Sequence, residues 1–256
     1  MALPQDRPPT PATAPAAAPT LAALELAGYD EGWDSKWTDM RRHGPTGRHL
    51  RRIIARVIAD LPAETVLDVG CGEGSLIQAL RAGKPAVYSG ADFSESALRI
   101  ARQRTPDAEF FRLDLTEGAL DRRFDLVLCT DVVEHIEDDV TAIANLARMT
   151  GKYLLVATMQ GRMRAYEKGV GHVRNYRYGE LRAKVEATGL VVDRVVQWGF
   201  PFFSPLYRDL LTLTGARGTE GEYGPVRRLI AEALYTLFLT NRWDRGDYVF
   251  VLARRP

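Results

Sequence analysis

Four short polar segments of this chain could carry chemistry, because each follows a stretch that is typical of a buried strand. The first is the glycine-rich run from Asp68 to Gly74, and the other three are centred on Asp92, Asp114 and Asp131. In an open parallel sheet, ligands bind in the crevice beyond the carboxyl ends of the strands. The order of the four segments therefore predicts one shared binding site.

The glycine-rich run, DVGCGEG, favours a cationic ligand over a dinucleotide. Its glycines let the backbone turn sharply and let a ligand approach without a Cβ in the way. The dinucleotide fingerprint needs a third glycine at the position of Ser75. In addition, Asp68 and Glu73 would repel a pyrophosphate at the start of the following helix. A hydride-transferring nicotinamide enzyme is therefore disfavoured.

The run from Val66 to Gly74 resembles the first motif of the class I, Rossmann-like S-adenosylmethionine-dependent methyltransferases, and the resemblance covers most of residues 46–200. The cofactor of that family carries a sulfonium and an ammonium, which suit acidic neighbours. The resemblance implies an enzyme that moves a methyl group from S-adenosylmethionine to an acceptor. It also implies that the cofactor contacts Asp68, Gly70, Cys71, Gly72, Asp92, Phe93, Asp114, Leu115, Cys129 and Asp131.

The resemblance gives several of these residues a role. Asp92 takes the place of the acidic residue that holds both ribose hydroxyls through charge-assisted hydrogen bonds. Asp114 matches the carboxylate that accepts from the adenine amino group, with the backbone of Leu115 beside it and Phe93 as an apolar wall. Asp131 or its neighbours' carbonyls would face the methionine moiety. Each aspartate taken alone could equally cap a helix or end a strand.

Catalysis would need little beyond positioning, because a sulfonium is already a strong electrophile and the acceptor must only be held in line. A residue that takes the acceptor's proton would add to the rate. The candidates are His172, on the loop after the fifth strand, and His135, with Asp131, Glu134 and Tyr176 behind them. His172 is the better base candidate, because Glu134 and His135 also fit a helix start.

The same polar residues offer oxygen and nitrogen ligands for a divalent ion, as in catechol-type and ubiquinone-pathway relatives. They are Asp131, Glu134, His135 and His172. Only two of them are adjacent, and no tight ligand spacing supports a site. We therefore expect no metal.

Two further regions could complete the site. In enzymes of this resemblance, a segment such as residues 29–49 folds over the cofactor, and Tyr29 or Arg48 could meet the methionine carboxylate. Aromatic residues after Trp198 suit an apolar or ring-bearing acceptor, although core packing explains them equally well: Phe200, Phe202, Phe203 and Tyr207. A basic cluster could attract an anionic group of the acceptor or simply be a solvated face: Arg162, Arg164, Lys168, Arg174 and Arg177.

Short apolar runs alternate with helical patterns along the chain, which predicts an α/β fold. The expected strands are 65–69, 86–91, 109–113, 124–129, 153–158, 190–198 and 247–253. The expected helices are 46–60, 73–81, 94–104 with Ser94 as N-cap, 137–149 and 178–188. We expect a Rossmann-like, open, twisted and mostly parallel sheet of about seven strands, with helices on both faces and the last strand antiparallel.

The expected organisation has five parts. Residues 1–20 form a disordered leader, 21–61 a helical cap over the cofactor, 62–198 the cofactor-binding core, 199–246 a helical insertion, and 247–256 the final strand of the core. The insertion holds one apolar helical stripe, which predicts packing onto the main domain or a dimer partner, with a substrate lid or a lipid-facing surface as alternatives: Leu229, Ile230, Ala233, Leu234, Leu237 and Phe238.

Composition excludes several classes of protein. Lysine and arginine number 34 against 33 acidic residues, so no global field favours nucleic acid or an anionic membrane. No apolar run approaches the ~20 residues that span a bilayer. Cys71 and Cys129 lack the spacing of a disulfide framework or a zinc site, which favours a reducing cytoplasm.

Three functions stay open at this point. A small-molecule O- or N-methyltransferase, in specialised metabolism for example, fits best. Methylation of RNA or protein is disfavoured by the balanced charge and by the lack of an appended RNA-binding module. A protein that binds S-adenosylmethionine without chemistry is the third, because a fold alone never proves activity.

Overall fold

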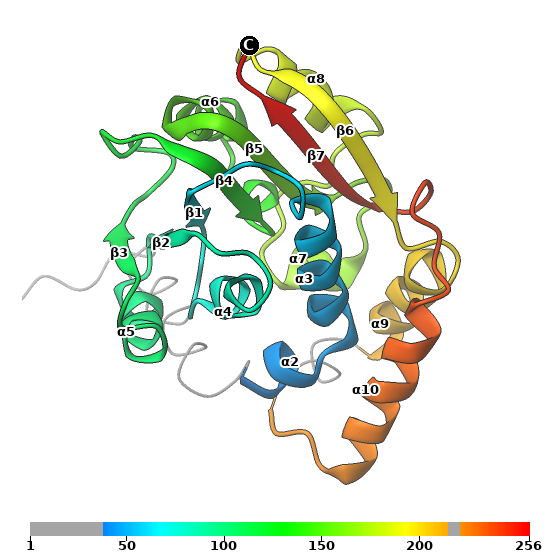
Figure 1. The fold of residues 1–256 in the computed structure, drawn as a ribbon. Helices are drawn as coiled ribbons and strands as arrows, with labels where there is room; N and C mark the ends of the chain where they lie inside the picture. The colour runs from blue at the N-terminus through cyan, green and yellow to red at the C-terminus, as the bar shows by residue number, and fades with distance from the viewer. Residues whose placement is uncertain (1–37, 215–220) are drawn as a thin grey trace, which may run out of the picture.

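Seven strands form one twisted sheet in the part of the chain that the computed structural model describes, residues 38–214 and 221–256 (Figure 1). Their order across the sheet is β3-β2-β1-β4-β5-β7-β6. The strands are β1 (Thr65–Val69), β2 (Val87–Asp92), β3 (Glu109–Arg112), β4 (Phe124–Thr130), β5 (Thr150–Met159), β6 (Val191–Trp198) and β7 (Tyr248–Arg254). The first five pair in parallel, and β7 runs antiparallel to β5 and β6. The predicted fold class is confirmed.

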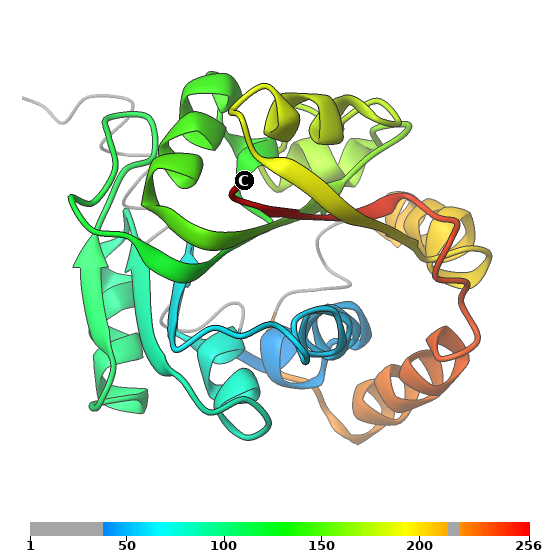
Figure 2. The same cartoon turned by 45° about the horizontal axis from the view of Figure 1, so that its top comes forward.

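Helices cover both faces of this sheet, as Figure 2 shows. Those that the sequence predicts are α3 (Pro45–Val57), α4 (Ser75–Arg81), α5 (Glu95–Arg104), α6 (Asp139–Met149), α8 (Glu180–Glu186) and α10 (Pro225–Phe238). Shorter ones lie in segments without a long apolar period: α2 (Thr38–His43), η2 (Val133–His135), α7 (Ala165–Gly169), η3 (Phe202–Tyr207) and α9 (Arg208–Thr214). None of the helices in the described ranges has the length and apolar character needed to cross a membrane.

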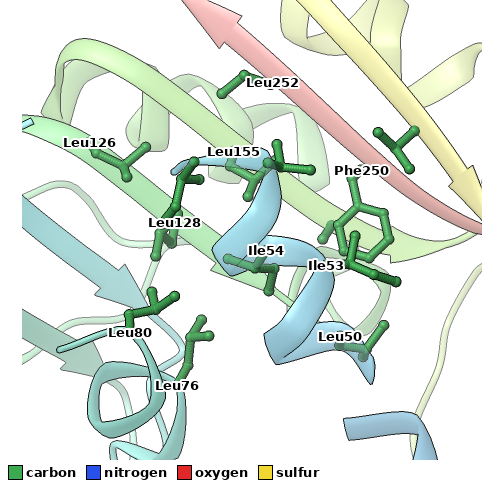
Figure 3. Close-up of a cluster of buried hydrophobic side chains, with 14 of the residues drawn as sticks. Leu50, Ile53, Ile54, Leu76, Leu80, Leu126, Leu128, Leu155, Phe250 and Leu252 are labelled. Carbon is green, nitrogen blue, oxygen red and sulfur yellow. The ribbon is translucent and has the colours of Figure 1, made fainter. Parts of the chain in front are cut away.

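The alternation of side chains along β4 divides the core into two layers. Leu126 and Leu128 pack with α3 and α4 on one face, whereas Val127 and Cys129 pack with α6 and α8 on the other. Figure 3 shows the first layer, in which Ile54 and its neighbours on α3 point toward the sheet. Because both faces are covered, the central strands are continuous apolar runs, as a parallel sheet requires.

The observed boundaries lie close to those expected, and local chemistry explains them. Pro45 begins α3 at the first helical position, where its missing N–H costs nothing. The Ser94 hydroxyl accepts from the backbone N–H of Ala97 at 3.1 Å, so the predicted N-cap of α5 is present.

The apolar stripe of the insertion divides between two sides of α10. Phe238 is buried and Leu234 half-buried against the main domain. Leu229, Ile230, Ala233 and Leu237 remain exposed, so for these four a dimer partner, a substrate lid and a lipid-facing surface stay the predicted alternatives. At 100° per residue the six positions span too wide an arc for one contact surface.

Candidate active site

A cavity of about 430 Å³ lies where the carboxyl ends of β1, β4 and β5 meet helices α2, α3 and α9. The loop after β1 contributes Asp68, Gly70, Cys71, Gly72 and Glu73, and the end of β4 contributes Thr130 and Asp131. The segment after β5 contributes Tyr166, Glu167 and His172. Two of the four predicted segments therefore line one cavity, at the edge of the sheet where the sequence places them.

The glycine loop after β1 has a backbone that other residues would not adopt easily. Gly70, Gly72 and Gly74 all have positive φ, at 73°, 52° and 81°. A Cβ on Gly70 would lie 2.1 Å from a methyl carbon of Val132, so the loops after β1 and β4 are in contact. The backbone N–H of Gly70 donates to the carbonyl of Ala91 at 2.7 Å, which attaches the loop to the end of β2.

Asp92 connects this glycine loop to the start of α5. Its side chain is 3% exposed. One carboxylate oxygen accepts from the N–H of Gly72 at 2.8 Å, and the other accepts from the N–H of Ser94 at 2.9 Å. Asp92 therefore holds the glycine loop against the first turn of α5.

Asp68 gives the cavity an acidic wall. Burial, and next the nearby Asp92, raise the pKa of Asp68 to about 8. A cation bound against it would lower this pKa again and would itself be stabilised. The wall therefore suits a positively charged ligand.

A second acidic group lies at the end of β4. Asp131 has a left-handed backbone, with φ 54°, and opens onto the cavity. The hydroxyl of Tyr248 on β7 donates to its carboxylate at 2.5 Å. Burial, and next the carboxylate of Glu134, raise the pKa of Asp131; burial likewise raises that of Glu134. Sequence reasoning missed Tyr248, because only the sheet order brings β7 beside β5 and so near β4.

The two candidate bases are in contact, but only His172 lines the cavity. The rings of His135 and His172 meet edge to face, with centroids 4.7 Å apart. Burial, and next the neighbouring His135, lower the pKa of His172; burial also lowers that of His135. Both rings are therefore mainly neutral near pH 7.

Glu134, His135 and His172 bring one ligand atom each to within 4.8 Å of one another. Both carboxylate oxygens of Glu134 are buried without a hydrogen-bond partner among the described residues. The three side chains could hold a divalent ion, which the spacing in the sequence could not show. The expectation of no metal remains a prediction.

The rest of the cavity wall is apolar and aromatic. It includes Met40, Leu50, Ile54, Phe203, Tyr207, Leu211 and Tyr223. Of the predicted aromatic residues, Phe203 and Tyr207 lie here, whereas Phe202 packs against the core and Phe200 lies beneath Arg245. In the predicted basic cluster, Arg164 pairs with Asp209 and Asp247, and Arg174 pairs with Asp139. These arginines belong to internal ion pairs.

The remaining predicted cofactor residues lie away from this wall. Phe93 is 40% exposed and Asp114 is exposed, whereas Leu115 and Cys129 are buried in the core. Arg48 pairs with Glu232 of α10 at 2.6 Å; Arg51, one helical turn later, lines the cavity instead. Tyr29 lies outside the described residues. The adenine contacts expected at Phe93, Asp114 and Leu115 therefore remain predictions.

The strand order, the glycine loop and the acidic cavity define a Rossmann-like protein with a ligand site at the carboxyl ends of its strands. Residues 66–152 match a family model described as a methyltransferase domain. The chain is 32% identical over 156 residues to a ubiquinone biosynthesis O-methyltransferase of Thiobacillus denitrificans, covering 56% of this chain and 66% of that protein. A protein of the same name from Alkalilimnicola ehrlichii is 31% identical over 121 residues, with 44% and 49% covered. The chain thus spans 66% and 49% of the length of these two relatives.

Solved structures agree on the fold. Magnesium protoporphyrin IX methyltransferase from Synechocystis PCC 6803 with bound SAH has a TM-score of 0.55 at 19% identity, covering 92% of this chain and 95% of that one. The N-methyltransferase NodS from Bradyrhizobium japonicum WM9 has a TM-score of 0.57 at 16% identity, covering 91% and 97%. The comparisons thus show a methyltransferase domain over residues 66–152 and a fold shared with solved methyltransferases.

Proposed function

We propose that this protein transfers the methyl group of S-adenosylmethionine to an oxygen of a small, ring-bearing or apolar acceptor. One observation carries the proposal: a single cavity joins the acidic glycine loop to an apolar aromatic wall, with His172 and Asp131 on the same surface. The relatives are named as O-methyltransferases of ubiquinone biosynthesis, which supports oxygen as the acceptor atom. The balanced charge of the chain argues against nucleic acid as the acceptor.

The residues present fit this cofactor. Asp68 is a buried carboxylate that needs a cation beside it to ionise fully near neutral pH, and the cofactor brings a sulfonium and an ammonium. Gly70 and Gly72 would let its amino-acid moiety approach the backbone, and Asp92 would accept from the ribose hydroxyls. When bound, the cofactor supplies an electrophilic methyl group. Arg51, which lines the cavity, is better placed than Arg48 for a carboxylate.

The chain's own residues would then orient the acceptor and take its proton. Phe203, Tyr207 and Tyr223 hold an apolar ring and exclude water. A neutral His172 can accept the proton of the acceptor hydroxyl, because burial keeps its pKa below the usual value. The carboxyl of Asp131 can orient the same hydroxyl. The proposal gives His172 the role of base and His135 a supporting one.

The test measures methyl transfer directly. The protein is incubated with S-adenosylmethionine and with catechols, phenols or amines of matched ring size, and the demethylated cofactor product is quantified. We expect turnover with the hydroxyl compounds, and a loss of about 100-fold or more in kcat for His172→Gln with little change in cofactor affinity. Tight cofactor binding without turnover on any acceptor would favour a non-catalytic binding protein, and turnover only on RNA or protein would exclude the small-molecule proposal.

A further inference from the structure

Beside His172, a series of partly buried hydrogen bonds leads along the cavity wall to Glu167 and from there to Arg208. Asn175 lies next to it, with its side-chain oxygen 3.3 Å from Nδ1 of His172. The side-chain nitrogen of Asn175 donates to Glu167 at 2.8 Å. On the far side, Nε of Arg208 donates to the other oxygen of Glu167 at 2.8 Å. Glu167 is 1% exposed and Arg208 is fully buried, so water has little access to the bond between them, whereas the two bonds of Asn175 are partly buried.

The chemistry of these groups fixes the direction of every bond in the series. Glu167 is paired with the Arg208 guanidinium and also accepts from the backbone N–H of Arg164 at 2.7 Å, so it is an ionised group that only accepts. Asn175 must therefore turn its NH₂ toward Glu167. Its other end is then an oxygen, which has no hydrogen to give. Nδ1 of His172 must donate to that oxygen, which leaves the basic lone pair on Nε2.

We propose that Asn175, oriented by Glu167, is a positioning residue that holds His172 in the tautomer with its hydrogen on Nδ1. The inference rests on the proposed function, in which His172 is the base. During transfer, the acceptor's O–H proton would pass to Nε2 while the new O–CH₃ bond forms and the S–CH₃ bond breaks with its electron pair on sulfur. His172 then carries a hydrogen on both nitrogens, and its positive charge is stabilised through Asn175 toward Glu167.

The tautomer matters because Nε2 must carry a lone pair to take the proton of the methyl acceptor. A neutral ring with its hydrogen on Nε2 has no lone pair there and cannot act as a base at that nitrogen. In catalytic triads of hydrolases, loss of the correct tautomer lowers kcat by up to about 10⁴-fold while the geometry is kept. The same reasoning applies to any histidine in which one ring nitrogen donates to a fixed hydrogen-bond acceptor.

The test compares two substitutions at one position by a readout that needs no acceptor. Protein labelled with ¹⁵N at its four histidines is studied by long-range ¹H–¹⁵N correlation at pH 8, and the His172 signals are assigned from His172→Gln. We expect the Nδ1–H pattern in the wild type and in Asn175→Gln, which retains both the amide oxygen and the NH₂ group. In Asn175→Leu, which has neither, we expect the Nε2–H form to appear.

Kinetics with catechol as the acceptor supply the second readout. We expect Asn175→Leu to lower kcat about 100-fold, while its KM and cofactor affinity stay within about twofold of the wild-type values. The loss of kcat should become smaller at high pH, because the hydroxyl of catechol then ionises without a base. Asn175→Gln should recover most of the rate. An Nε2–H pattern in the wild type, or an unchanged pattern in Asn175→Leu that is folded by thermal melting, would overturn the inference. An Nδ1–H wild type that methylates no acceptor would instead refute the proposed function.

Discussion

At the residue scale, the site depends on carboxylates whose surroundings determine what each can do. Asp92 uses both oxygens to fix the glycine loop and the start of α5. Asp68 has a raised pKa because it is buried beside Asp92. Asp107, in contrast, is an exposed carboxylate whose pKa is lowered by its bond to Arg81. The same residue type therefore orders the glycine loop in one place and forms a surface ion pair in another.

Replacing Asp92 by alanine should weaken cofactor binding strongly. The substitution leaves the buried N–H groups of Gly72 and Ser94 without their acceptor and removes the predicted ribose contact, so we expect the Kd for S-adenosylmethionine to rise at least about 30-fold, or 2 kcal/mol. Isothermal titration calorimetry measures it. Asp107→Ala is the matched control and should bind as the wild type does. Equal affinities for both variants would remove Asp92 from the site.

At the scale of elements, the position of the cavity follows from close contacts between strands and loops. Gly90 in β2 lies beneath the ring of Phe110 in β3 and beside the sulfur of Cys71 in the glycine loop. A Cβ on Gly90 would approach those atoms to 2.7 and 2.8 Å. The loop can therefore lie this close to the sheet only because β2 has no side chain at that point.

Gly90→Ala should thus affect both stability and binding. Overpacking of this kind costs about 1–3 kcal/mol of unfolding free energy, and displacement of Cys71 should weaken cofactor binding as well. Gly83→Ala is the control, because its Cβ would meet no atom within 4 Å. Urea unfolding monitored by circular dichroism distinguishes the two variants. A Gly90→Ala protein as stable as the control would show that β3 and the loop can move apart without cost.

At the scale of the whole molecule, several acidic groups are buried in or beside one cavity. Burial raises the pKa of Asp68, Asp131 and Glu134 in the folded protein. His49, stacked between Trp198 and Tyr235, shows the opposite effect, because burial lowers its pKa to about 4. Near neutral pH, the folded chain therefore binds more carboxyl protons than the unfolded chain. At mildly acidic pH, it binds fewer histidine protons.

The cofactor-free protein should lose stability as the pH rises from 6.5 to 8. Over this range the unfolded chain has already released the protons of these carboxyls, whereas the folded chain still binds them, so their contribution lowers the unfolding free energy as the pH rises. The unfolded histidines are half protonated at pH 6.5, and each histidine with a lowered folded pKa adds about 0.4 kcal/mol in the opposite direction, which offsets only part of the loss. Asp68 alone should account for about 1–2 kcal/mol. Chemical denaturation at both pH values measures it. In Asp68→Asn the loss should be smaller, and S-adenosylmethionine should reduce it in the wild type. A wild-type protein that gains stability over this range would contradict the assignment.

The sequence by itself determined the order of strands and helices, the glycine loop and the carboxylates at the strand ends, because these depend on periodicity and on local backbone chemistry. Ser94 as N-cap is one such case. Tertiary structure alone decided that Tyr248 meets Asp131, that Arg51 rather than Arg48 lines the cavity, and that Asn175 connects His172 to Glu167 and Arg208. Such contacts join residues from separate elements, and their partners are selected by sheet order and by the burial of polar groups, neither of which leaves a periodic signal in one sequence.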